Sequence, residues 1–333
     1  MMFRKNEKCY YYNAPIIFDM NQMGIGMSVT MLPAILQIKN NFPNEIYAHC
    51  HQHHVDIIKY FIDEDNLYPF YDSNDPDLNK DKIFVGEKAR HVICYDGSAT
   101  IHAPHACHPV DHFMHLWTGR TKVPVEEKNY PRFPVEKIDI SKFNLPDKFI
   151  VIGPGSTKSI CQLPVNTIND LIDYCKYSGY EVVLLGSEYN FTLHFNNEKM
   201  VIGPNMPPIN DNACINLINK TKLDECIAIL DKACCYIGPE GGLMQFTGMT
   251  DTPMVIGING WEPEMRMPYR HDELGWKAYP VTPSEELECR FCIQKTIHAK
   301  TVNIMMQCIY DDFKCVEEHM GFPNFKPQLD KIL

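Results

Sequence analysis

Residues 223–245 read LDECIAILDKACCYIGPEGGLMQ, and the fold prediction starts from these residues. Its first half predicts an amphipathic helix, because apolar residues recur at the spacing of one helical face (Leu223, Cys226, Ile227 and Leu230). A short strand at 234–237, a Gly-rich turn, a second helix at 243–249 and a buried strand at 253–257 follow. A strand that runs through glycines into a helix leaves unpaired backbone N–H groups at the carboxyl edge of a sheet, where α/β proteins bind phosphates. A tight connection whose glycines only permit a positive φ also fits this pattern.

The bulk composition is that of an ordinary soluble globular protein. The chain has 333 residues, 45% of them apolar and 22% charged, which suits one large domain or two of ordinary size. No stretch approaches the ~20 apolar residues of a membrane span. The first residues lack the apolar core of a signal peptide, so we expect a cytoplasmic protein. The net charge of −11 argues against non-specific binding to nucleic acid or anionic membranes.

Fourteen cysteines are scattered along the chain, several of them in apolar runs. This distribution favours reduced core thiols over a disulfide framework. One pair, Cys289-x-x-Cys292, followed by His298 and Cys308, also fits a structural zinc site. A single CxxC pair is a modest signal, so we expect reduced thiols and no bound metal.

Strands and helices alternate in the N-terminal half. The predicted strands are 14–19, 45–50, 82–85 and 91–95, and the predicted helices are 28–40 and 55–62. Ser28 has the residue type of an N-cap for the first helix. Alternation with short loops predicts a parallel sheet in a Rossmann-like domain.

A second αβ series follows a connector rich in proline and charge. The strand 149–152 ends in Gly153-Pro154-Gly155-Ser156-Thr157-Lys158, a helix runs from Pro164 to Lys176, and the strand 181–185 ends in Gly186-Ser187-Glu188. Gly155, Ser156, Thr157 and Lys158 offer amides, hydroxyls and an ammonium at a strand end, which suits an anionic phosphate. The spacing is not that of a Walker motif, and a solvated loop is the alternative.

Histidines gather in two places after predicted strands. The first group is His49, His51, His53 and His54; the second is His102, His105, His108, His112 and His115. Their spacing matches no standard zinc pattern, so polar surface residues and a metal site both stay open for the first group. For the second group we favour proton transfer, because imidazole titrates near neutral pH and Asp111 is close in sequence.

Several short segments occur in the order typical of a known family. They are 24–26 (GIG), 32–35 (LPAI) with 42–43 (FP), 153–156 (GPGS) with 163–164 (LP), 183–186 (VLLG), 223–242, 252–255 (TPMV), and Cys289, Cys292 and Cys308. Their shared order over most of the chain resembles glycosyltransferase family nine, the ADP-heptose:lipopolysaccharide heptosyltransferases and their relatives.

The resemblance implies an α/β fold of GT-B architecture, with two Rossmann-like parallel-sheet domains facing across a cleft. We assign 1–122 to an acceptor domain, 123–147 to a linker, 148–315 to a nucleotide-sugar donor domain, and 316–333 to a tail that packs back on the first domain. By position, the implied donor-binding residues are Ser156, Thr157 and Lys158 for the phosphates, Gly186, Ser187 and Glu188 for the base or ribose, and Glu240, Gly241, Gly242, Leu243 and Met244 for the diphosphate.

The chain departs from the family at four positions. Met27 stands where the family has the Asp usually assigned as catalytic base, and a thioether cannot accept a proton. Glu240 replaces an Asp, Gln245 replaces a His, and Gln162 replaces a basic residue. Other candidates for the base are Asp19, Asp96, His105, His108 and Asp111; we select Asp96 and His108 first, then Asp111.

Two arginines follow a late strand near Trp261. Arg266 or Arg270 could clamp a phosphate, and a plain surface loop is the alternative. The donor site needs no metal ion, because the sequence has no Asp-x-Asp and helix-end amides can carry the phosphate charge.

These observations support one hypothesis and leave two alternatives. The first is an inverting, metal-independent glycosyltransferase that moves a sugar from a nucleotide-diphosphate donor to a hydroxyl of a glycan or lipid-linked acceptor. The second uses the same donor chemistry on a modified base in DNA, as a viral-type enzyme would, although the acidic net charge disfavours a duplex partner. The third, motivated by Met27, is a degenerate module that only binds a nucleotide or glycan.

Overall fold

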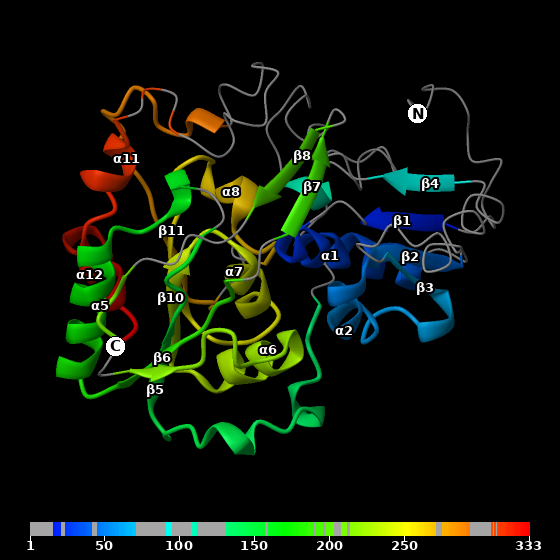
Figure 1. The fold of residues 1–333 in the computed structure, drawn as a ribbon, viewed down its shortest axis with the longest axis horizontal. Coiled ribbons are helices and arrows are strands. Elements are labelled where there is room, and N and C mark those ends of the chain that lie inside the picture. Colours follow the sequence, from blue (N-terminus) through cyan, green and yellow to red (C-terminus); the bar gives the residue numbers. More distant parts are fainter. Residues whose placement is uncertain are drawn as a thin grey trace. The chain divides into compact units, whose positions relative to one another are not determined.

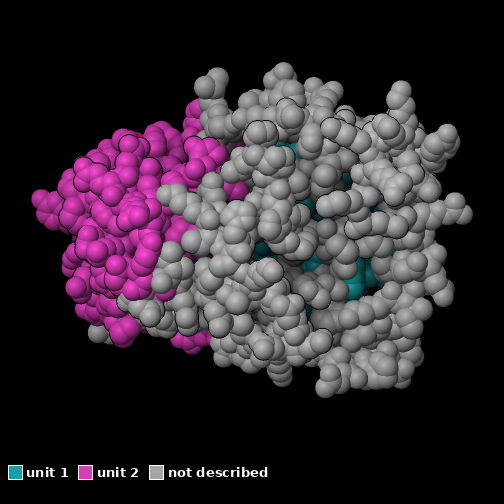
Figure 2. Space-filling view, turned by 90° about the horizontal axis from the view of Figure 1, so that it is seen from above, with its two compact units in different colours: residues 1–132 teal, residues 133–333 magenta. Residues whose placement is uncertain are grey.

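The computed structural model describes most of the second half of the chain and part of the first. The described residues are 16–20, 24–41, 45–70, 91–94, 108–111, 131–156, 159–188, 191–195, 198–202, 208–211, 214–270, 275–293, 308, 310 and 312–333. The chain divides into two compact units, unit 1 (residues 1–132) and unit 2 (residues 133–333). Figure 2 colours them separately. Their boundary falls within the linker that the sequence predicts at 123–147.

Unit 1 contains a four-stranded parallel sheet in the order β3-β2-β1-β4. Its strands are β1 (Ile16–Met20), β2 (Ile46–His51), β3 (Leu67–Phe70) and β4 (His91–Cys94). Consecutive residues of β1, Ile16, Ile17 and Phe18, are all buried, as in a central strand covered on both faces. The predicted strand at 82–85 lies outside the described residues.

Helix α1 (Ile25–Asn41) is longer than its prediction. Ser28 is not its N-cap, because the Ser28 N–H already donates to the Gly24 carbonyl within the first turn. The predicted second helix is shorter, with a 3-10 turn η1 (Gln52–His54) leading into α2 (Val55–Ile58), and η2 (Glu64–Asn66) follows before β3.

Unit 2 contains a six-stranded parallel sheet in the order β12-β11-β10-β5-β6-β9. Its strands are β5 (Phe149–Ile152), β6 (Glu181–Leu184), β9 (Ile215–Asn216), β10 (Cys235–Pro239), β11 (Met254–Gly257) and β12 (Ala278–Val281). A separate antiparallel hairpin pairs β7 (Phe191–Phe195) with β8 (Glu198–Ile202). The hairpin, β9 and β12 were not predicted.

Helices lie on both faces of this sheet (Figure 1). They are α5 (Val165–Tyr177), α6 (Leu223–Lys232), α7 (Gly242–Thr247), α8 (Pro263–Arg266), α11 (Lys314–Glu317) and α12 (Phe322–Leu329), with 3-10 turns η4 (Val135–Lys137), η5 (Ser141–Phe143) and η6 (Ser159–Cys161). Helix α5 follows the predicted period, and its buried face, including Ile168, Leu171 and Cys175, packs on the alternating inward residues of the sheet.

The tail also belongs to unit 2. Met320, Phe325 and Leu329 lie in the same buried core as α5 and the sheet, and Figure 1 shows α12 beside α5. These apolar side chains of the tail lie in the core of unit 2, and the packing of residues 316–333 back on the first domain stays a prediction.

The expected fold class, an α/β protein of GT-B type with two Rossmann-like parallel-sheet domains, is confirmed by the two parallel sheets and by the solved structures reported below. Among the described helices, none is both long enough and apolar enough to cross a bilayer.

Candidate functional site

Two glycine-bearing turns meet at the carboxyl edge of the unit 2 sheet. Strands β5 and β10 are hydrogen-bonded parallel neighbours, so the turns that follow them leave the sheet side by side. The Gly153 N–H donates to the Ile237 carbonyl at 2.9 Å, and a Cβ on Gly153 would lie 2.7 Å from the Tyr236 hydroxyl and 3.0 Å from Leu243 Cδ1. Only glycine fits this close approach, which holds the β5 turn against the start of α7.

The side chain of Gln162 stabilises the turn after β5 with two hydrogen bonds. The Ser156 N–H donates to Gln162 Oε1 at 3.0 Å, and Gln162 Nε2 donates to the Pro154 carbonyl at 2.6 Å. Gly155 is half-buried and Ser156 is buried, whereas Thr157 and Lys158 lie outside the described residues. Gln162, which replaces the family's basic residue, therefore stabilises the conformation of its own loop.

The turn after β10 carries a buried carboxylate. The Glu240 N–H donates to the Gly257 carbonyl at 3.0 Å, and the Glu240 side chain is only 6% exposed. Gly241 is exposed, Gly242 and Leu243 are half-buried, and Met244 is buried. Three of the residues predicted to present amides to a diphosphate, Gly241, Gly242 and Leu243, are thus accessible to solvent.

Arg266 pairs with this carboxylate from the next loop of the sheet edge. Its Nε lies 3.4 Å from Glu240 Oε1, and its guanidinium lies 4.0 Å from the centroid of a Trp261 ring. Gln245, which stands where the family has a His, donates from Nε2 to the Arg266 carbonyl at 2.8 Å and so joins α7 to α8. Sequence reasoning named Arg266 but gave no signal for its pairing with Glu240, which lies 26 residues earlier.

Arg270, the other candidate for a phosphate clamp, makes its contacts within the folded chain. It is buried, and it donates from Nη1 to the Thr250 carbonyl at 3.0 Å. Its Nη2 lies 3.3 Å from Asp251 Oδ1, and its guanidinium lies 4.7 Å from a Trp276 ring centroid. These contacts tie the segment after α8 to the end of α7.

The third predicted group follows β6, the strand next to β5 in the sheet order. The Glu188 N–H donates to Asn219 Oδ1 at 2.8 Å, and Asn219 Nδ2 donates back to Glu188 Oε2 at 3.0 Å. Both side chains are exposed. Gly186, Ser187 and Glu188 therefore lie at the same sheet edge as the two glycine-bearing turns, one strand beyond β5.

A buried serine–histidine pair lies beside Met27 in unit 1. Ser28 Oγ is 3.0 Å from His54 Nδ1, and both side chains are buried. Burial, with the nearby charges of His51 and His53, lowers the pKa of His54 to about 3, so this ring is neutral at physiological pH. The His51 ring lies 4.9 Å from the His53 ring and 5.5 Å from the His54 ring, so three of the four histidines of the first group lie together.

The structure describes the side chains of two of the candidates for the catalytic base, His108 and Asp111. His108 and Asp111 are both buried. The His108 Nδ1 accepts the Val110 N–H at 3.2 Å, so the neutral ring carries its proton on Nε2. Asp96 and His105 lie outside the described residues, as do His102, His112 and His115. The roles assigned to these residues stay predictions.

Residues 82–301 match the model of glycosyltransferase family 9 (heptosyltransferase), which is more than half of the 333 residues. The chain belongs to glycosyltransferase family 9. Its members transfer sugars, so the expectation that the chain is a glycosyltransferase is confirmed. No curated protein matches the sequence.

Solved structures with a similar fold include three glycosyltransferases. The iron-containing dodecameric glycosyltransferase TibC from enterotoxigenic Escherichia coli H10407 has a TM-score of 0.67 at 13% identity, covering 96% of this chain and 76% of TibC; TibC has also been solved with ADP-D-β-D-heptose. A family 9 glycosyltransferase from Veillonella parvula DSM 2008 has a TM-score of 0.60 at 14% identity, covering 92% and 98%. The Escherichia coli ADP-heptose lipopolysaccharide heptosyltransferase II has a TM-score of 0.57 at 14% identity, covering 86% and 98%.

The C-terminal cysteines of this family 9 chain form no ready metal site in the described residues. Cys292 and Cys315 are buried, and burial raises the pKa of both thiols, that of Cys315 to about 12, with Cys289 and Cys308 adding to the effect. No group of three or more His, Cys, Asp or Glu side chains in the described part of the chain is arranged to hold a metal ion. His298 lies outside the described residues.

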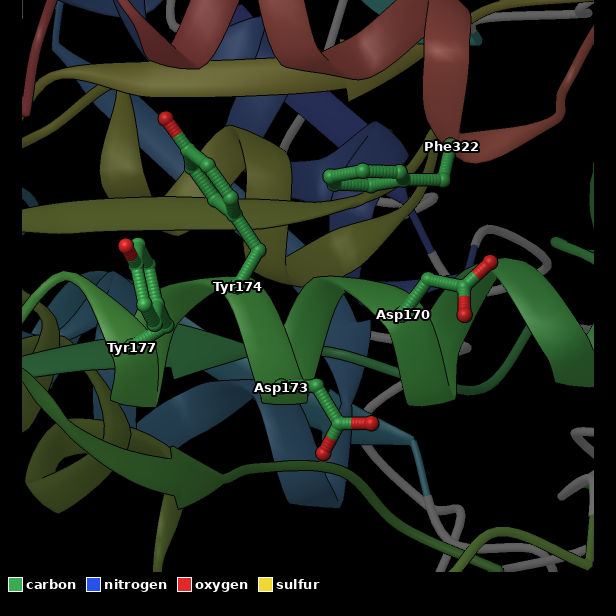
Figure 3. Close-up of a pocket in the computed structure, with 5 residues that line it drawn as sticks. All are labelled: Asp170, Asp173, Tyr174, Tyr177 and Phe322. Carbon is green, nitrogen blue, oxygen red and sulfur yellow. The ribbon is translucent and has the colours of Figure 1, made fainter.

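A shallow hollow of about 410 Å³ lies elsewhere on unit 2. Figure 3 shows Asp170, Asp173, Tyr174 and Tyr177 along the outer side of α5, with Phe322 reaching toward them from α12. Because α5 runs back from the carboxyl edge of the sheet, its C-terminal half lies away from the donor turns. The hollow is therefore not part of the candidate site.

Proposed function

We propose that this family 9 glycosyltransferase moves a sugar from a nucleotide-diphosphate donor to a hydroxyl of a glycan or lipopolysaccharide-like acceptor, with inversion and without a metal ion. The observation that carries the proposal is the meeting of two glycine-bearing turns at the carboxyl edges of β5 and β10. Backbone N–H groups in such turns bind phosphates, and they stabilise a departing diphosphate without a cation. The complex of TibC with ADP-D-β-D-heptose makes ADP-heptose the first donor to test.

The base in this proposal comes from Asp96, His108 or Asp111, since Met27 cannot accept a proton. Asp96 comes first. His108 already uses its acceptor nitrogen for the Val110 N–H, so it would have to release that bond before taking a proton.

The test combines binding and turnover on the purified full chain. Thermal unfolding is followed with ADP, UDP and GDP, each compared with its nucleoside, and ADP release is followed with ADP-heptose as donor. A bound nucleoside diphosphate at about 100 times its Kd should stabilise the protein by about 2.7 kcal/mol, because it binds only the folded state. A chain that binds none of the three diphosphates would contradict the proposal.

The same experiment separates the alternatives. Tight diphosphate binding without any turnover would favour a degenerate binding module, the hypothesis that Met27 motivates. A DNA acceptor predicts that turnover depends on added duplex and falls steeply with salt. The net charge of −11 favours the glycan acceptor over that second candidate.

A further inference from the structure

Arg266 is held in a fixed orientation at the sheet edge by partners from two loops. Its Nε faces Glu240 Oε1 at 3.4 Å from the turn after β10, and Trp261 from the turn after β11 supports the guanidinium face at 4.0 Å. The side chain is 16% exposed, whereas the Glu240 side chain is 6% exposed. The cation therefore lies between a buried carboxylate and solvent.

Buried Glu240 explains why this cation stays in place. A buried carboxylate is costly unless it is paired and hydrogen-bonded. Arg266 supplies the opposite charge, and the Cys161 thiol lies 3.8 Å from Glu240 Oε2 as a weak donor. Since the ion pair uses the Nε edge of a planar guanidinium, it fixes the plane in which the remaining N–H groups lie.

The helix that carries Arg266 is tied to α7, and the loop before this helix is tied to the loop after β5. Gln245 Nε2 donates to the Arg266 carbonyl at 2.8 Å from α7. Asn259 Nδ2 donates to the Ile160 carbonyl at 2.6 Å and joins the β11 loop to the loop that follows β5. The three loops at the ends of β5, β10 and β11 thus form one connected edge around Glu240 and Gly241.

We propose that Arg266 is a donor-binding residue of this enzyme, which contacts the diphosphate and is oriented by Glu240 and Trp261. The inference rests on the proposed function. In the transfer, the bond between the sugar anomeric carbon and the diphosphate oxygen breaks, and its electron pair stays on that oxygen. The acceptor oxygen forms the new bond to the anomeric carbon, and its proton passes to the base. A guanidinium beside the diphosphate stabilises the charge that gathers there.

The competing explanation is that Arg266 only neutralises Glu240. The two roles differ in one measurable quantity, the gain in affinity that the phosphates give a nucleotide over its nucleoside. We therefore measure the Kd values of ADP and adenosine by calorimetry for the wild-type chain, Arg266→Met and Arg266→Lys. Arg290→Met is the matched control, because Arg290 also stacks on an aromatic ring (Phe291, 4.5 Å) and pairs with a glutamate (Glu285, 3.5 Å).

We expect Arg266→Met to weaken ADP binding about 10- to 100-fold, with adenosine binding unchanged, because a charge-assisted hydrogen bond is lost. Arg266→Lys should recover part of the loss, and Arg290→Met should bind ADP like the wild type. An equal loss for ADP and adenosine, or no loss at all in a folded Arg266→Met, overturns this role while the proposed function stands. A wild-type chain that binds no nucleoside diphosphate overturns the proposed function as well.

Discussion

At the scale of single residues, the buried imidazole of His54 links stability to pH. Its pKa is about 3 in the folded chain, chiefly because of burial, against an ordinary value of 6.5. Between these values the unfolded chain binds a proton at His54 and the folded chain does not, so stability falls as the pH drops below 6.5.

We predict that the free energy of unfolding decreases by about 2 kcal/mol between pH 7 and pH 5 through His54 alone. His54→Gln keeps an acceptor for Ser28 and cannot take up a proton, so its stability should depend less on pH by that amount. Urea unfolding at the two pH values measures the difference. His53→Gln, which changes an exposed neighbour, should keep the wild-type dependence; equal dependence in His54→Gln and wild type would refute the prediction.

At the scale of elements, Gly248 sets the distance between α7 and the segment after α8. A Cβ at this position would lie 2.8 Å from Pro268 Cγ and 3.1 Å from the Gln245 carbonyl, and still closer to Pro268 Cβ. A proline ring and a helix backbone cannot move aside cheaply.

Gly248→Ala should therefore lower the free energy of unfolding by about 1–3 kcal/mol through overpacking. Displacement of the segment that carries Arg266 should also weaken ADP binding. Gly321→Ala is the control, because its Cβ would meet only Pro323 Cδ at 3.5 Å and its φ of −71° suits any residue. Thermal unfolding and ADP calorimetry on both variants provide the measurements, and equal stability of the two would count against this packing argument.

The elements that the sequence predicts well are those with a strong apolar pattern. Strands β5, β10 and β11 and helix α5 lie within about two residues of their predicted bounds, and α6 (Leu223–Lys232) forms where an amphipathic helix was predicted. Two missed strands, β3 and β12, each contain a proline, Pro69 and Pro280, and each lies at the edge of its sheet. A proline argues against a central strand but fits an edge strand, and edge position is a tertiary property that local sequence does not carry.

At the scale of the whole molecule, the proposal separates donor binding in unit 2 from proton removal in unit 1. Asp96→Asn should lower the rate of sugar transfer by about 10²- to 10⁴-fold, the usual contribution of a general base. The Kd for ADP should stay at its wild-type value. ADP calorimetry and turnover with ADP-heptose measure the two quantities separately, and Asp111→Asn tests the next candidate. Full turnover in Asp96→Asn would show that another residue is the base.

The candidate site was only partly predictable at this scale. The order of short motifs indicated the family and predicted that Gly155, Ser156, Glu240 and Gly241 share a binding site. The structure places them at one edge of the unit 2 sheet. The partners of those residues were not predictable, because Arg266 and Trp261 act through contacts between loops, and Gln162 through side-chain hydrogen bonds within its own loop. Their residue types alone fit a surface loop equally well.

The prolines at the outer strands also bear on behaviour at high concentration. A proline is tolerated in a strand where its nitrogen faces away from the ladder, so Pro69 and Pro280 leave a gap in the row of donors that each outer strand shows to other molecules. A strand from a second molecule finds no continuous row of donors along β3 or β12. The same prolines that obscure these two strands in the sequence thereby disfavour the pairing of β3 or β12 with a strand of another copy.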